Sequence, residues 1–258
     1  MEVKGDMSAI VAGLPAMVPD CNIAITQPKV KDVCAFGEDR FFTCVFFFSK
    51  AEEMAKEIKM GNSQLEMLAD FQILMIVLDE DSEVRDNILD FFHLILPSYI
   101  VQFDAGSINF RLEEKGKIVG QLNPMTFSSF QKMLEQLFVP TSLVSSDMPD
   151  YNPANDQAAA IAAKLKAGRE KVAQEKQQAN GGEKQCVFGH FSSILAIGMA
   201  MDINIFFNYT PFQLFDAYIR HNKKRAFDFY QKVSTTPLMD VSKLDEPDDW
   251  TAYTYTSL

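Results

Sequence analysis

The stretch from Thr210 to Val233, TPFQLFDAYIRHNKKRAFDFYQKV, constrains the fold most strongly, because it predicts a long helix. Thr210 can cap the helix, a proline occupies the first helical position, and Gln213 stands where a capping box places Glu or Gln. Apolar residues then recur at helical spacing, with a basic break over Arg220–Arg225. The pattern predicts either one long helix or two helices joined at His221–Asn222, with one face packed on the preceding segment.

The segment before this helix predicts its packing partner. Residues 186–200 carry several large apolar side chains and predict a second apolar helix. A short connection over residues 202–208 then leads to Thr210. We therefore expect a helical hairpin domain over residues 183–234.

Residues 21–140 predict a mixed α+β domain with its own core. Three short segments alternate apolar and polar residues and are separated by turn sequences. They predict a small antiparallel three-stranded meander. The strands are expected over 98–104, 107–113 and 116–122, after a short strand over 21–26 and a helix that begins near Pro28.

Several helices are expected around this meander. The phenylalanine-rich segment 38–49 fits a buried helix or a strand, and its helix-prone flanks favour the helix. Further helices are expected over 64–78, from Ser82 to Pro97 and from Thr126 to Pro140, with Ser82 and Thr126 as N-caps. The expected fold class is therefore α+β and mostly helical.

Three further segments complete the expected organisation. Residues 1–20 are rich in Gly, Ala, Met and Pro without a clear period and predict an irregular arm. Residues 141–182 predict a linker and a poorly buried bridging helix, because Ala, Lys, Glu and Gln dominate them. Residues 235–258 form an acidic and aromatic tail, whose rings could dock on a partner or pack on the chain itself.

The composition limits the class of partner. The net charge is −11, from 24 basic and 35 acidic residues, and an acidic chain repels phosphate backbones. No apolar run is long enough to span a bilayer, and no signal peptide pattern is visible. We therefore expect neither a nucleic acid nor a membrane as partner.

No residue cluster in the sequence predicts chemistry. Motifs for phosphate binding, dinucleotide binding, serine hydrolysis and zinc proteolysis are absent. The four cysteines form no C-x-x-C pair, and buried reduced thiols are expected. His190 follows Cys186 at helical spacing, but one Cys and one His do not make a metal site. We expect no catalysis, no metal and no cofactor.

Three stretches of distinctive sequence follow one another in a fixed order. They are QPKVKDVCAFGEDRF (27–41), NPANDQAAAIAAKLKAGREKVAQEK (152–176) and ILAIGMAMDINIFFNYTPFQLFDAYIRHNKKRAFDFYQ (194–231), followed by Trp250. This layout resembles a protein of the tail gene cluster in tailed phages of Gram-positive and gut bacteria. The resemblance implies a role in tail morphogenesis like that of tail assembly chaperones, which shield the tape-measure protein until tube subunits polymerise around it. The acidic, tyrosine-rich extension at the C-terminus departs from the family pattern.

The expected function is therefore non-catalytic binding of the tape-measure protein, or of other tail components, in the host cell cytoplasm. A structural subunit of the mature tail, baseplate or connector, located in the virion, is the alternative. Among the partners, self-association stays open beside the binding of phage tail proteins. Faces rich in Phe and Met suit helix-in-groove contacts with a helical client, although the same residues can fill an ordinary core. The expected partner-binding residues are Phe212, Phe215, Tyr218, Ile219, Trp250, Tyr253 and Tyr255.

Overall fold

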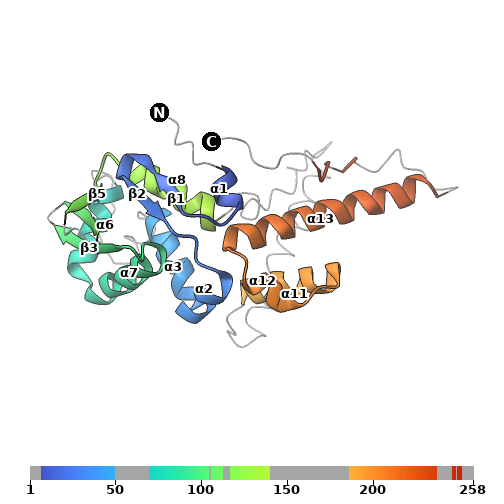
Figure 1. Cartoon of the computed structure of the whole chain (residues 1–258), viewed down its shortest axis with the longest axis horizontal. Coiled ribbons are helices and arrows are strands. Elements are labelled where there is room, and N and C mark those ends of the chain that lie inside the picture. The colour runs from blue at the N-terminus through green and yellow to red at the C-terminus, as the bar shows by residue number, and fades with distance from the viewer. Residues whose placement is uncertain are drawn as a thin grey trace, which may run out of the picture. The chain divides into compact units, whose positions relative to one another are not determined.

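The computed structural model of the chain describes residues 7–49, 70–104, 106–112, 117–139, 186–236, 246–247 and 249–251. The chain divides into two units, residues 1–140 together with 187–258, and residues 141–186. The helices and strands described below all belong to the first unit (Figure 1). This unit is α+β and mostly helical, as the sequence predicts.

Phenylalanine rings fill the centre of the α+β part. They come from helices α3 (Glu38–Ser49), α6 (Asp70–Glu80), α7 (Ser82–Ile95) and α8 (Phe127–Phe138). The helix expected over 38–49 is therefore confirmed. Phe41 of α3 meets Phe138 of α8 edge to face at 5.1 Å, and Phe48 meets Phe130 at 5.4 Å. Edge-to-face pairing is the favoured geometry of aromatic rings, and all four of these rings are fully buried.

The predicted meander is also confirmed. Strands β3 (Tyr99–Asp104), β4 (Ser107–Leu112) and β5 (Ile118–Leu122) form an antiparallel sheet in the order β3-β4-β5. Phe110 of β4 is fully buried and stands opposite Gly120 of β5. An added Cβ at Gly120 would lie 2.5 Å from the carbonyl oxygen of Cys21, so this glycine lets β5 approach the N-terminal segment closely.

The expectation of an irregular arm at residues 1–20 is wrong where the structure describes it. The segment forms α1 (Met7–Val11), β1 (Ala16–Val18) and the 3-10 helix η1 (Pro19–Cys21), and β1 pairs with β2 (Ile23–Ile25) in an antiparallel ribbon. The amide of Gln27 donates to the carbonyls of Ile10 and Leu14, at 3.2 and 2.7 Å. Elements of three to five residues are too short to show a period, which explains why the sequence pattern misses them.

Two predicted helix caps differ in the structure. The side chain of Asp81, not Ser82, caps α7 and accepts from the backbone N–H groups of Glu83 and Val84 at 2.9 and 3.1 Å. Thr126 is the N-cap residue of α8, but its side chain makes no capping bond. Its hydroxyl donates instead to the carbonyl of Gln121 at 3.1 Å. At the start of α7 a carboxylate and a hydroxyl compete, and the sequence alone does not show which one reaches the backbone.

The C-terminal part is the expected helical hairpin. Helix α11 (Val187–Met199) and helix α13 (Pro211–Ser234) pack together, and the expected connection contains a short helix, α12 (Ile203–Phe207). The predicted capping box at Thr210 and Gln213 is present. Helix α13 runs without a break through His221–Asn222. Two ion pairs at i,i+4 spacing, Asp216–Arg220 and Lys224–Asp228, place the basic break on its surface.

The sequence predicts the hairpin as a separate domain, and the structure corrects this prediction. Residues 187–258 belong to the same compact unit as residues 1–140. The physical reason is an aromatic stack, described below, that joins α11 to α3. The linker and bridging helix expected at residues 141–182 lie outside the described residues. Helix α2 (Val30–Phe36) begins two residues after Pro28, in agreement with the predicted helix start. Across the part of the chain that the structure describes, no helix has the length and apolar character needed to cross a membrane.

Candidate functional site

The base of the hairpin is an aromatic stack. The ring of Phe188 on α11 lies 5.4 Å from Phe42 of α3, nearly parallel to it, and 5.6 Å from Phe215 of α13. Phe191, one turn further along α11, meets Phe215 edge to face and approaches Tyr218 to 4.3 Å. These contacts join both helices of the hairpin to α3 and hold them at a fixed angle.

Three hydrogen bonds attach the same end of the hairpin to the α+β part. A carboxylate oxygen of Glu38 accepts from the N–H of Phe188 at 3.1 Å, in the first turn of α11. The N–H of Val30 donates to the carbonyl of Tyr209 at 2.8 Å. The amide of Gln213 donates to the carbonyl of Val11 at 2.8 Å. Since the first N–H groups of a helix lack partners within that helix, the Glu38 carboxylate both satisfies one of them and complements the helix dipole.

The two helices are also in contact near the other end of α11. The ring of His221 on α13 lies against Gly198, where an added Cβ would stand 2.5 Å from Cε1. Burial lowers the pKa of His221 below its ordinary value of 6.5, and the charges of Arg225 and Lys224 lower it further. The Nε2 atom is buried without a hydrogen-bond partner in the structure. The neutral imidazole therefore acts as a packing group between the helices.

A left-handed residue turns the chain after α11. Ala200 has φ +52°, and the N–H of Met201 donates to the carbonyl of Ala196 at 3.0 Å, which is the long bond of a Schellman motif. The side chain of Asp202 then caps α12 by accepting from the N–H of Asn204 at 2.9 Å. Both ends of this turn are therefore fixed by hydrogen bonds, and the chain between α11 and α12 has a defined conformation.

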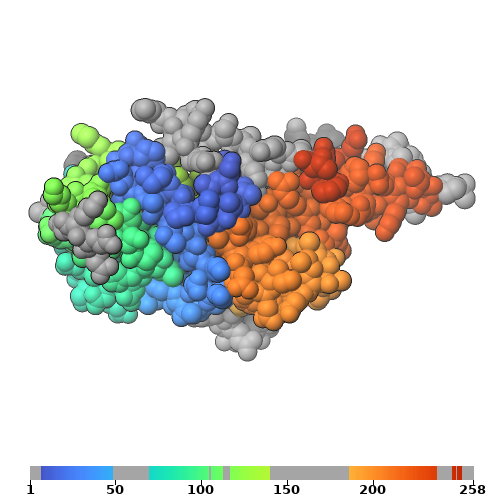
Figure 2. All heavy atoms as spheres, in the orientation of Figure 1, coloured from blue at the N-terminus to red at the C-terminus, as the bar shows by residue number. Residues whose placement is uncertain are grey.

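Five large apolar side chains are exposed along this turn. We call them the apolar turn; Figure 2 shows the hairpin to which they belong in orange. Ile197 is 82% exposed, and the other four are exposed by more than a third. Phe206, by contrast, is buried and anchors α12 against Tyr209 at a ring distance of 5.5 Å. The apolar turn consists of Ile197, Met199, Met201, Ile203 and Ile205.

The apolar turn is suited to protein binding. Exposed large apolar side chains scattered singly over a surface are ordinary, whereas contiguous apolar patches mark interaction sites, and here five such side chains fall within nine residues. The Schellman motif and the Asp202 cap hold the backbone of this segment in place before any partner arrives. Such pre-organisation reduces the entropy that binding costs.

The partner-binding residues that the sequence predicts do not belong to the apolar turn, and they differ in exposure. Phe212 and Phe215 are only 6% and 4% exposed, so their rings pack inside the fold and present no free surface. Tyr218 and Ile219 are half-buried along α13. Trp250 is half-buried, with its ring 6.0 Å from the ammonium of Lys224. Tyr253 and Tyr255 lie outside the described residues.

The sequence analysis missed the apolar turn, although a signal is present. Apolar residues occupy every second position from Ile197 to Ile205, within a stretch that is otherwise helical. In a helix, residues two apart do not face the same side, so this spacing cannot be buried completely by one packing face. An alternating apolar pattern across a helix end therefore indicates exposed apolar side chains.

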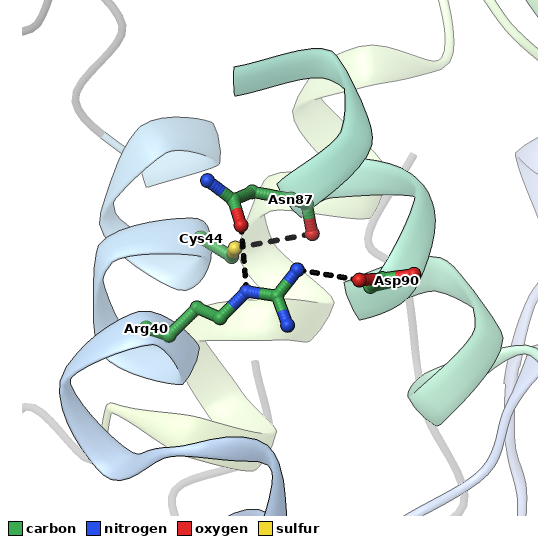
Figure 3. A network of polar contacts seen from close by, with 4 residues as sticks. All are labelled: Arg40, Cys44, Asn87 and Asp90. Carbon is green, nitrogen blue, oxygen red and sulfur yellow. Dashed lines mark hydrogen bonds and ion pairs between the residues drawn. The ribbon is translucent and has the colours of Figure 1, made fainter. Parts of the chain in front are cut away.

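A polar network joins α3 and α7 (Figure 3). Arg40 donates to the side chains of Asn87 and Asp90, at 2.6 and 2.5 Å, and the thiol of Cys44 donates to the carbonyl of Asn87 at 3.7 Å. Burial raises the pKa of Cys44 to about 12, and the nearby charge of Arg40 offsets this only in part. A thiol with such a pKa stays protonated at neutral pH, so the network joins the two helices and offers no nucleophile.

The remaining acidic, histidine and cysteine residues do not assemble a metal site within the described ranges, where no group of three or more of them could hold an ion. Cys186, which the sequence places one turn before His190, is exposed. The hairpin with its apolar turn is thus the site that the geometry favours. No family model matches this chain, and neither a curated protein nor a solved structure matches it.

Proposed function

We propose that the protein is a non-catalytic binding protein of phage tail assembly, which uses the apolar turn to hold an apolar face of a helical client. The client is the tape-measure protein, a long helical protein with an apolar stripe. The proposal rests on the resemblance of three stretches of the sequence to tail morphogenesis proteins. The single structural observation that supports it is the exposure of five apolar side chains on a turn whose backbone is held by hydrogen bonds.

The chemistry of the apolar turn suits a repetitive helical client. Two of its five side chains are methionines, which are flexible and adapt to differently shaped partners. Three are isoleucines, which bury a large apolar area without bringing a polar atom into the contact. A helix that lays its apolar stripe on such a surface leaves its polar face in water. The contact therefore lacks strict sequence specificity, as a client with many similar repeats requires.

A pair of variants tests this proposal. Ile197→Glu combined with Ile205→Glu places two charges in the apolar turn, at side chains that are already exposed. Met125→Glu is the matched control, because Met125 is 91% exposed and precedes α8, outside the hairpin. The tape-measure protein of the same tail gene cluster is co-expressed with each variant, and its soluble fraction and its co-purification are measured. We expect both to fall with the double variant and to stay unchanged with the control.

Two outcomes would contradict the proposal. Equal recovery of the tape-measure protein with all variants would remove the apolar turn from the contact. Detection of this protein in purified virions, in a fixed copy number by quantitative mass spectrometry, would favour the structural subunit of the tail, baseplate or connector. A chaperone-like protein is absent from the mature particle.

A further inference from the structure

Helix α13 carries a concentration of positive charge that contrasts with the rest of the chain. Residues 220–232 contain five basic side chains and one acidic side chain, whereas the whole chain has a net charge of −11. The basic residues begin next to His221, whose ring contacts Gly198 near the end of α11. We call residues 220–232 the basic half of α13. Their charge suits an acidic ligand.

The chain itself contains a segment of complementary charge. Four of the five residues in 245–249, with the sequence DEPDD, are acidic, and Trp250 follows them directly. This tryptophan is the only one in the chain. We call residues 249–251, which the structure describes, the C-terminal segment. It combines the opposite charge with a large amphipathic ring, the kind of side chain that anchors protein contacts.

One end of the C-terminal segment already lies on α13. The ring of Trp250 stands 6.0 Å from the ammonium of Lys224, within reach of a cation–π contact. A local turn directs the ring, because the carboxylate of Asp249 accepts from the N–H and the hydroxyl of Thr251, at 2.8 and 2.7 Å. The same ammonium pairs with Asp228 at 2.7 Å. Lys224 is thus held between a carboxylate of its own helix and the indole of the C-terminal segment.

We propose that the C-terminal segment is an internal ligand of the basic half of α13, anchored by Trp250 on Lys224. Charge complementarity and the observed position of the ring both support this occupant. While the segment is docked, the ring of Trp250 lies beside the ammonium of Lys224, and an external acidic protein that uses this part of α13 has to displace it. The inference concerns a different surface from the apolar turn and does not depend on the proposed function.

The single tryptophan makes the docked state directly measurable. Intrinsic tryptophan fluorescence reports on Trp250 alone, and quenching by acrylamide measures how much of its ring is open to solvent. Lys224→Gln removes the cation and keeps a good helix former at an exposed position. Asp228→Asn is the matched control, because it breaks the same ion pair but leaves the ammonium under the ring.

We expect Lys224→Gln to increase quenching. The ratio of docked to undocked segment should fall about two- to fivefold, which is the change that the loss of an exposed cation–π contact causes. Quenching of the Asp228→Asn variant should equal that of the unsubstituted protein. Added salt should increase quenching of the unsubstituted protein, because it screens the attraction between the segment and the helix.

Two results would overturn the proposal. An equal response of the two variants, or no response, would show that Lys224 does not hold the ring. Protection of Trp250 that weakens on dilution would mean that the segment of a second copy occupies α13. Protection that stays constant across a dilution series, together with the difference between the variants, supports an internal ligand.

Discussion

The imidazole of His221 on α13 occupies the space next to Gly198 of α11 into which a Cβ atom would project. A Cβ at position 198 would stand 2.5 Å from Cε1 of the ring, a distance that real Cβ contacts do not reach. The absence of a side chain at residue 198 therefore sets the separation of the two helices, and the ring of His221 fills the space that the glycine leaves.

Gly198→Ala should destabilise the protein by about 1–3 kcal/mol, because the added methyl group forces the ring of His221 or one helix to move. The free energy of unfolding, from urea titration followed by circular dichroism, measures this effect. In the His221→Ala background the same substitution should stabilise by up to about 1 kcal/mol, since alanine favours a helix more than glycine does. A loss of equal size in both backgrounds would mean that the ring is not the obstacle.

Acidification should destabilise the hairpin through His221. Its pKa in the folded protein is lowered from 6.5 by burial and by the charges of Arg225 and Lys224, so the unfolded chain takes up a proton at a higher pH than the folded chain does. The stabilising effect of the neutral ring is complete above pH 6.5 and is lost as the pH falls below that value. The unfolding free energy of His221→Gln should therefore fall less steeply than that of the unsubstituted protein between about pH 7.5 and 5.5. Parallel profiles would contradict the prediction.

Ala200→Gly should stabilise the protein by about 0.5–1 kcal/mol, because Ala200 holds a left-handed conformation that glycine adopts without strain. Thermal unfolding followed by circular dichroism measures the gain. Ala196→Gly provides the control, since residue 196 lies within α11, where glycine costs about 1 kcal/mol relative to alanine. The two substitutions should therefore change the stability in opposite directions. A loss of stability in both variants would contradict the prediction that glycine relieves strain in the turn after Met199.

The buried thiols should be unreactive in the folded protein. Burial raises the pKa of Cys21 to about 11 and that of Cys44 to about 12, so thiolate is scarce at neutral pH. Disulfide exchange with Ellman's reagent should therefore be at least about 100-fold slower at these residues than at an ordinary exposed cysteine. The exposed Cys186 should react first, and Cys186→Ser should remove that fast phase. Rapid labelling of Cys44 without denaturant, detected by peptide mass spectrometry, would contradict this account.

The long elements of the fold are predictable from the sequence because their signals are local. The capping box of Thr210 and Gln213 and the alternating strands of the meander each depend on residues a few positions apart. The N-terminal segment is different. Its short elements are held by the amides of Gln27 and Gln213, and nothing in the local sequence indicates which carbonyls these amides reach.

The candidate site was predictable only in part. Aromatic residues at helical spacing in α13 correctly indicate contact surfaces, but the sequence does not show whether the partner belongs to the same chain. The structure places Phe215 against Phe188 and Phe191 of α11, so the hairpin uses this ring for its own packing. The apolar turn was missed, because its exposure depends on the left-handed Ala200 and on where α11 ends.

The hydrogen bond between Gln213 and Val11 also determines when folding can be completed in the cell. The two residues lie 202 positions apart, so the ribosome needs about 10–40 s to synthesise the chain between them. The N-terminal segment leaves the ribosome first, but it lacks this partner until α13 has been made. A nascent chain halted before α13 cannot form the bond, so the final docking of the N-terminus takes place late in translation or after release.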